Sequence, residues 1–241
     1  DIVIAVVDEM KQRLVEQHNL SSENIVIVPN AEKKEFAHNF DDQTPSYFIN
    51  EENRFIISYV GGFGPHRGLH TAILGMKEIS SQIPNSKLVL VGPSNNDVRS
   101  HLQSLINENS LENFVEIRSK EPFKNVVNIM QSSDVNIIPH ISNEHTESAV
   151  PHKFFQILLS GKPLLVSDCA PMKRLVLDND IGNYFISEDS SSFANSIKNI
   201  HNNYQSALQK ASKGNEKSLN GELNWEFTSK NLVHLYDNLN K

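Results

Sequence analysis

The chain has 241 residues, of which 38% are hydrophobic and 21% are charged, and its formal net charge is −7. This composition is typical of a globular protein, and the acidic balance argues against a general nucleic-acid-binding protein, which needs a basic excess to neutralise phosphates. The single cysteine, Cys169, excludes an internal disulfide framework, and no apolar run approaches the roughly 18 residues of a membrane-spanning helix.

The first part of the chain predicts a strand, a helix and a second strand. Residues 2–7 and 25–28 are apolar runs, and residues 9–17 have helical periodicity. The segment 31–53 is polar, acidic and aperiodic, which predicts a linker or an irregular crossing. Because the chain opens directly on a strand without an initiator Met, we expect it to be a portion excised from a longer protein.

After this segment, strands alternate with helices. We expect strands at 55–60, 87–91, 114–117, 135–139, 164–166 and 183–186. We expect helices at 67–81, 95–107, 123–131, from 151 onward, 171–177, 190–212 and 225–239. Short strands that are apolar on both faces and separated by helices indicate a parallel sheet covered on both sides. The expected fold class is therefore α/β, with a doubly wound, Rossmann-like parallel sheet.

In such a sheet, ligands bind beyond the carboxyl ends of the strands. The first loop at this edge belongs to the stretch YVGGFGPHRGL, at 59–69. Gly61, Gly62 and Gly64 allow unusual backbone angles and close approach of a ligand, and Arg67 lies near the start of the next helix, where an anion is favoured. The stretch matches neither the dinucleotide fingerprint nor a Walker loop. A tight turn with a solvated arginine is the alternative.

A second candidate anion site begins the helix after the irregular segment 140–150. Pro151, His152 and Lys153 place cations at a helix N-terminus, where they oppose the macrodipole unless an anion lies over it. A diphosphate held by Arg67 and Lys153 would satisfy both loops. One turn further on, Gln156 could reach a ribose hydroxyl, or it could simply solvate the helix face.

Four stretches of the main series of strands and helices carry a family resemblance. YVGGFGPHRGL, KLVLVGPS, FVEIRS and VNIIPHISNEHTESAVPHKFFQILLSGKPLLVSD follow one another in an order that resembles the nucleotide-binding half of retaining GT-B glycosyltransferases of the large family 4 type. The opening strand–helix–strand and the final NWEFTSKNLVHLYDNL are similar to that family's acceptor-domain end and crossing helix. The resemblance implies an acceptor-domain remnant (1–35), a linker (36–53), a donor-binding domain (54–220) and a crossing helix (221–241).

The resemblance also implies a function. The protein would transfer a sugar from a nucleotide-diphosphate sugar to a glycan or lipid-linked acceptor, in polysaccharide, lipopolysaccharide or other glycan synthesis. It would need neither a metal nor a cofactor, and it would bind no nucleic acid. Its location would be cytoplasmic, at the inner face of a membrane in the full-length protein, with the acceptor and any membrane contact on the missing domain. The isolated fragment would be inactive.

Residue roles follow from the same resemblance. Arg67 and Lys153 would stabilise the leaving diphosphate, the base would lie against 118–120, and the sugar pocket would be lined by 143–148. The full set of expected donor-binding residues is Gly61, Gly62, Gly64, Arg118, Ser119, Lys120, Asn143, His145, Glu147, Ser148, Pro151, His152 and Gln156.

The chain also departs from the family's pattern. Gly62 stands where the family has the arginine of its clamp, and Arg67 takes the lysine position. Ser148 and Gln156 replace the usual pair of glutamates, and Glu147 lies one position early. These departures indicate a subfamily pattern, or alternatively a sugar-nucleotide-binding module without catalysis. A GT-B epimerase, with Glu147 as the carboxylate at the sugar, is a third interpretation.

Overall fold

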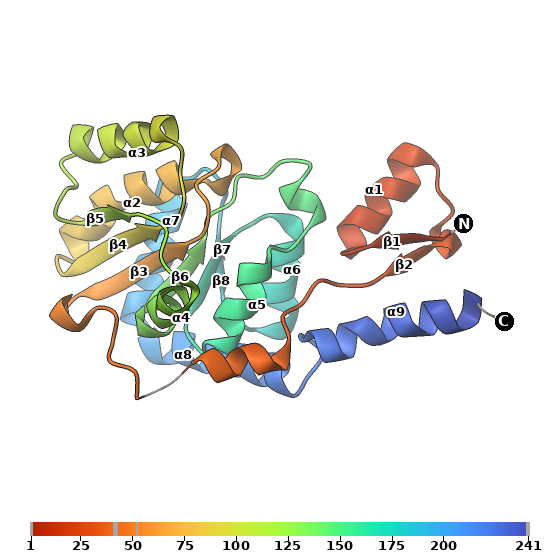
Figure 1. Cartoon of the computed structure of the whole chain (residues 1–241). Helices are drawn as coiled ribbons and strands as arrows, with labels where there is room; N and C mark the ends of the chain where they lie inside the picture. Colours follow the sequence, from red (N-terminus) through yellow and green to blue (C-terminus); the bar gives the residue numbers. More distant parts are fainter. Residues whose placement is uncertain (1, 41–42, 52, 240–241) are drawn as a thin grey trace.

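The computed structural model describes residues 2–40, 43–51 and 53–239. Figure 1 shows a central sheet with helices on both faces and a smaller unit at one end, where the two termini lie. The strands of the described ranges are β1 (Val3–Ala5), β2 (Ile25–Ile27), β3 (Phe55–Val60), β4 (Ser86–Val91), β5 (Val115–Arg118), β6 (Val135–Ile138), β7 (Leu164–Ser167) and β8 (Asn183–Phe185).

The helices connect these strands in alternation, as the sequence predicts. They are α1 (Asp8–His18), α2 (Leu69–Gln82), α3 (Asn96–Glu108), α4 (Phe123–Ser132), α5 (His152–Leu159), α6 (Ala170–Asn179), α7 (Ser190–Asn202), α8 (Tyr204–Leu219) and α9 (Trp225–Leu239). Across the described residues, none of these helices combines the length and the apolarity that crossing a bilayer requires.

The main sheet has the strand order β5-β4-β3-β6-β7-β8, and all its strand pairs are parallel. The chain moves outward from β3 to β5, returns through α4 and then moves outward again from β6 to β8. The direction therefore reverses between β3 and β6, and a ligand crevice is expected at the carboxyl ends of these two strands. The predicted doubly wound α/β fold is confirmed.

Alternation along the strands decides which helices cover which face. Ile57 and Tyr59 belong to one buried cluster with residues of α2, α3 and α7. Ile56, which points the other way, packs with Ile129 of α4. Residues of α5 and α6 pack against β6 and β7 in one buried cluster with Met130 of α4.

One predicted helix differs in the structure. The helix predicted at 190–212 is wrong as a single element, because α7 ends at Asn202 and α8 begins at Tyr204, with Asn203 outside helical geometry (φ −120°, ψ 41°). The described residues of the polar segment 31–53 include aromatic side chains that pack on the main domain. Phe36 is buried against Val127 and Leu159. Phe48 is buried on the face of β3 and β4 that α4 covers, in the cluster of Ile56 and Ile129.

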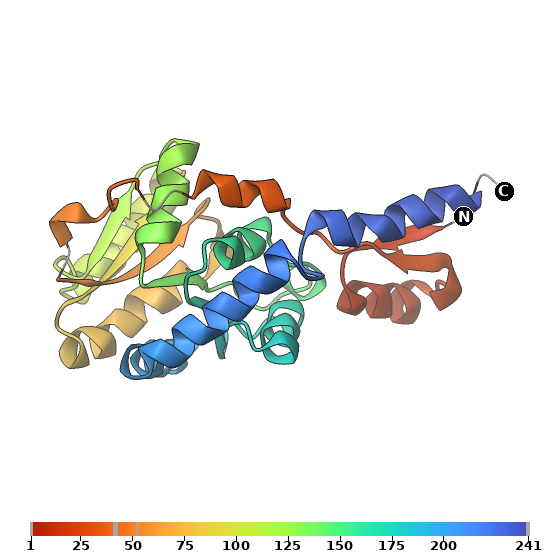
Figure 2. The same cartoon turned by 90° about the horizontal axis from the view of Figure 1, so that it is seen from below.

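The smaller unit consists of the parallel pair β1–β2 with α1 and α9 (Figure 2). Ion pairs attach α1 to the main domain, since Arg174 of α6 lies 2.7 Å from Glu9 and 3.1 Å from Asp8. Arg13 also donates a 3.0 Å hydrogen bond to the carbonyl of Glu144, in the loop that follows β6. The unit therefore lies beside the edge of the sheet where the crevice is expected.

Candidate functional site

Two loops meet where the strand order reverses. The loop after β3 and the loop after β6 are joined by a 2.9 Å hydrogen bond from the N–H of Ile141 to the carbonyl of His66. Gly68 ends the first loop in left-handed geometry (φ 62°), and a side chain there would collide with the carbonyl of Pro139. This close approach brings Arg67 next to the second loop.

Arg67 is held by a buried histidine. Its Nη1 lies 2.8 Å from Nε2 of His140, and His140 is only 3% exposed. Burial, together with the positive charges of Lys153 and Arg67, lowers the pKa of His140 to about 2. The imidazole is therefore neutral, and its Nε2 accepts the hydrogen bond from the guanidinium.

Lys153 lies on the first turn of α5 and points back under the glycine loop. Its Nζ is 3.8 Å from the centroid of the Tyr59 ring, and a side chain at Gly61 would come within 2.7 Å of it. This nitrogen is buried and has no hydrogen-bond partner among the described residues. Burial and the nearby Arg67 hold its pKa well below the usual range of a lysine.

The N-terminus of α5, like the side chains of Arg67 and Lys153, favours a negatively charged ligand. Pro151 is its N-cap residue and makes no side-chain capping bond. By contrast, α3 and α7 are capped by the side chains of Asn95 and Asp189. An α-helix N-terminus without a side-chain cap presents free N–H groups and a partial positive charge.

The surrounding charges are unbalanced. The ring of His66 lies 5.8 Å from that of His145, and burial, Arg67, His145 and Lys153 lower the pKa of His66. None of the ion pairs formed by the described residues involves Arg67 or Lys153. A buried cation without an anionic partner is costly, so this arrangement is suited to an anion supplied from outside the chain.

Two hollows flank the cations. One, of about 340 Å³, is lined by the glycine loop with Arg67 and by residues 93–95. The lining of the other, of about 260 Å³, includes Gly61, Lys120, Lys153 and Gln156. The loop after β3, the loop after β5 and the helix α5 therefore line one cavity, as expected from the strand order.

Gln156 faces this cavity and also contacts the segment before the main domain. Its Nε2 donates a 2.9 Å hydrogen bond to Oε2 of Glu32, and Nδ1 of His152 lies 3.3 Å from the same oxygen. The Glu32 side chain is only 16% exposed, whereas that of His152 is 57% exposed. Glu32 was missed by the sequence analysis because it lies in a polar segment without periodicity.

The expected sugar-pocket residues are placed in one loop, and their polar groups have partners there. Asn143 accepts hydrogen bonds from the N–H groups of His145 and Thr146, and Ser148 donates to the carbonyl of Glu144. The Glu147 carboxylate accepts from Ser142 Oγ (2.6 Å) and from the N–H of Ala170 at the start of α6 (2.7 Å). These side chains shape the loop in this structure.

The expected base-binding loop divides into two kinds of residue. The Arg118 guanidinium forms paired hydrogen bonds of 2.7 and 2.9 Å with Glu116 and lies 5.2 Å from the ring centroid of Tyr47. This pairing lowers the pKa of Glu116 to about 2. The Arg118 guanidinium is therefore paired with Glu116 of the same strand, β5. Ser119 and Lys120, by contrast, are exposed.

Known proteins include a sequence relative and structural neighbours of this chain. An uncharacterized glycosyltransferase of Methanocaldococcus jannaschii is 24% identical over 182 residues, which is 73% of this chain and 42% of the relative. Anabaena HepE, solved in complex with UDP, has a TM-score of 0.79 at 16% identity, and the match covers 98% of this chain and 64% of the HepE chain. The sucrose-phosphate synthase of Thermosynechococcus elongatus has a TM-score of 0.74 at 20% identity, with coverages of 99% and 58%.

The structural neighbours share the GT-B fold, so the expected fold is confirmed, and this chain spans less than two thirds of each relative's length. The model of the family Glycosyl transferases group 1 matches residues 39–217, which include both loops of the site and all of the main sheet. The chain therefore belongs to the glycosyl transferases group 1 family.

Proposed function

We propose that this chain is the donor-binding part of a retaining glycosyltransferase of the family 4 type, which uses a nucleotide-diphosphate sugar. The observation that carries the proposal is the buried Nζ of Lys153, which lacks a partner among the described residues and lies at an uncapped helix N-terminus. Its neighbour Arg67 is held in place by His140. Together they provide a preformed site for a group with more than one negative charge.

The chemistry of sugar transfer gives these cations a role. When the bond between the sugar and the diphosphate breaks, negative charge develops on the leaving diphosphate. Preorganised positive charge stabilises this state without reorganisation at the moment of reaction. Arg67 can contact two phosphate oxygens through its planar guanidinium, and Lys153 acts as a point charge. In this proposal the charge comes from side chains and helix N–H groups, without a metal or an organic cofactor.

The cavity beside Lys153 is the proposed nucleoside site. Gly61, Gln156 and Lys120 line it together with Lys153, so an amide side chain and a buried cation share one cavity. We place the ribose at Gln156 and the base toward the loop 118–120. HepE, whose fold is similar, was solved with UDP and with UDP-glucose, which supports a nucleotide as the ligand here.

Two other proposals fit less well. An epimerase needs a carboxylate at the sugar, and the Glu147 carboxylate already accepts hydrogen bonds from Ser142 and Ala170. A binding module without catalysis remains distinguishable by experiment, because the full-length protein would then show no turnover with any donor. The 241-residue chain by itself is expected to bind a nucleotide diphosphate and to transfer no sugar, since the acceptor is proposed to bind outside it.

The test is calorimetry of the chain with uridine, adenosine and guanosine, each as the nucleoside, monophosphate and diphosphate. We expect one diphosphate to bind far more tightly than its nucleoside. Lys153→Ala should weaken diphosphate binding by roughly 10- to 150-fold, the loss of a charge-assisted contact of about 1.5–3 kcal/mol, and nucleoside binding much less. Arg67→Ala should do much the same, and the two effects should not add, because both side chains share one ligand group. Equal losses for all ligands would contradict the diphosphate site.

A further inference from the structure

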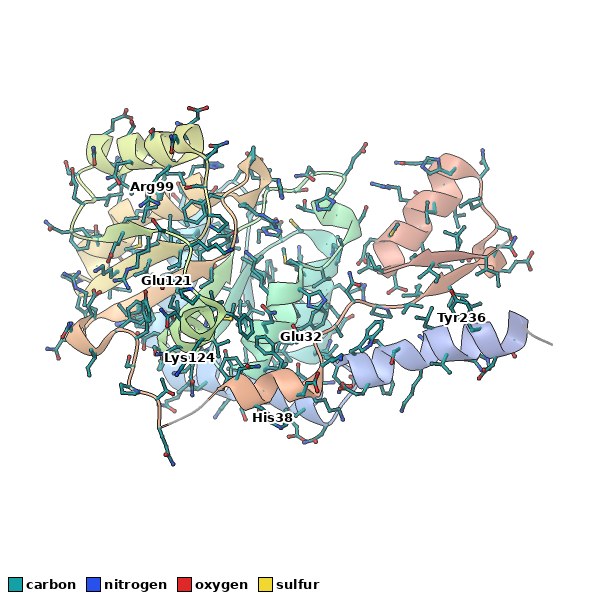
Figure 3. The ribbon with its side chains drawn as sticks, viewed as in Figure 1. Glu32, His38, Arg99, Glu121, Lys124 and Tyr236 are labelled. Atoms are coloured by element: carbon teal, nitrogen blue, oxygen red, sulfur yellow. The ribbon has the colours of Figure 1, made fainter. Side chains whose placement is uncertain are left out.

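We propose that Glu32 is a positioning residue for the donor site: its carboxylate orients the amide of Gln156 so that Oε1 faces the ribose. This inference rests on the nucleotide-binding function proposed above. The contact joins residues 124 positions apart, at 2.9 Å from Nε2 of Gln156 to Oε2 of Glu32. In Figure 3, Glu32 lies between α5 and the start of α9.

The first step is the fixed position of Glu32. Its carbonyl accepts a 2.9 Å hydrogen bond from the N–H of Trp225, the first residue of α9. Its Oε1 accepts a 3.0 Å hydrogen bond from the N–H of Lys33, and the side chain is only 16% exposed. The carboxylate is therefore held by contacts that do not depend on Gln156.

The second step is the direction of the Gln156 amide. An ionised carboxylate only accepts hydrogen bonds, so the end of the amide that faces Glu32 must be the NH₂ group. The amide oxygen then points away from Glu32. Among the hydrogen bonds of the described residues none involves this oxygen, and Gln156 lines the cavity of about 260 Å³. Glu32 thus leaves an acceptor available on the cavity side.

The third step is that a fixed amide oxygen gives the cavity a hydrogen-bond acceptor for the ribose hydroxyls. Ribose hydroxyls donate hydrogen bonds, and an acceptor in a fixed position binds them without the entropic cost of orienting it. A freely turning glutamine would present NH₂ or oxygen with similar ease. With Glu32 in place, Gln156 presents an oxygen to the ribose as a glutamate would, without adding a negative charge beside the diphosphate.

Glu32 also contacts His152, but this contact is weaker than the one that orients the Gln156 amide. Its Nδ1 lies 3.3 Å from Oε2 of Glu32, which is longer than the Gln156 contact, and its side chain is 57% exposed. Exposed contacts of this kind contribute little. Of the two contacts with this oxygen, the one with Gln156 is shorter and better buried.

The experiment compares the diphosphate that binds best in the nucleotide panel with its 2′,3′-dideoxy analogue. Glu32→Met removes the acceptor and should weaken the ribonucleotide about 3- to 10-fold, the effect of one neutral hydrogen bond, while the dideoxy analogue binds unchanged. Glu35→Met is the matched control, because Glu35 is exposed and, within the described ranges, its one ion-pair partner is Lys33. It should change neither affinity. Equal losses for both nucleotides, or no loss at all, would overturn the proposal.

An exchange of the two side chains tests the orientation directly. Gln156→Glu alone places two carboxylates within hydrogen-bond distance, so ribonucleotide binding should fall. The double variant Glu32→Gln with Gln156→Glu restores one donor facing one carboxylate, so its ribonucleotide binding should recover to clearly above that of Gln156→Glu alone, although the carboxylate now beside the diphosphate keeps it below that of the natural chain. A double variant no better than Gln156→Glu alone would refute the proposal. If the natural chain does not prefer a diphosphate over its nucleoside, the proposed function fails instead, and the inference fails with it.

Discussion

Arg67 donates a hydrogen bond from Nη1 to Nε2 of His140, over 2.8 Å, and thereby joins the loop after β3 to the loop after β6. The acceptor is neutral because burial and the neighbouring cations lower the pKa of His140 to about 2. A neutral imidazole accepts from the guanidinium without cancelling its charge. The guanidinium of Arg67 therefore keeps its positive charge while it is fixed in direction.

This relationship predicts different results for two substitutions of His140. Leucine cannot accept a hydrogen bond, so His140→Leu should free the guanidinium and weaken nucleotide-diphosphate binding about 3- to 10-fold. Glutamine can accept, so His140→Gln should bind nearly as well as the natural chain. Calorimetry with the preferred diphosphate measures both, and circular dichroism checks that both variants fold. Identical affinities for the two variants would show that the acceptor has no role.

The buried cation predicts a gain in stability when it is removed. Because the pKa of Lys153 is lowered, the folded chain holds the charged form poorly. This cost is full below the folded-state pKa, declines as pH rises and disappears above the unfolded value of about 10.4. Lys153→Met should therefore raise the free energy of unfolding of the empty protein by about 1 kcal/mol or more at neutral pH, and the Tm by roughly 2–4 °C.

The gain should shrink toward pH 10, which thermal melts at several pH values can measure. Addition of the preferred diphosphate should raise the Tm of the natural chain and leave that of Lys153→Met nearly unchanged. A variant less stable than the natural chain at pH 7 would contradict the cost assigned to this cation.

The same lowered pKa predicts that binding takes up protons. A diphosphate beside Lys153 favours its charged form and so raises its pKa toward the ordinary value. Affinity should therefore fall as pH rises through the pKa of the empty protein. Above pH 8 the diphosphate is fully ionised, and proton uptake can be measured there by calorimetry in two buffers of different ionisation enthalpy. Lys153→Met is the control and should show no uptake.

The source of the positive charge predicts metal independence. If Arg67 and Lys153 neutralise the diphosphate, EDTA should leave the affinity of the chain for its preferred diphosphate within about twofold, and it should leave the turnover of the full-length protein nearly unchanged. Titrations with EDTA and with added Mg²⁺ or Mn²⁺ test this. A loss of binding that a divalent ion restores would refute the assignment of the charge to the two side chains.

The sequence by itself determined the fold and the region of the site. Apolar strands such as 55–60 and 87–91 alternate with helices, and this pattern depends only on local periodicity and burial. The glycine loop and the basic start of α5 were identifiable because their residue types suit an anion at a helix N-terminus. The single cysteine, Cys169, is free and buried in the core.

Only the tertiary structure decided which polar groups face the site. Asn143, Ser148 and Glu147 carry groups suited to a sugar, but their partners in the loop and at α6 take up those groups. Glu32 reaches Gln156 from 124 residues away because the chain crosses back beside α9. Such contacts depend on which loops meet in space, and no local pattern along the chain records that.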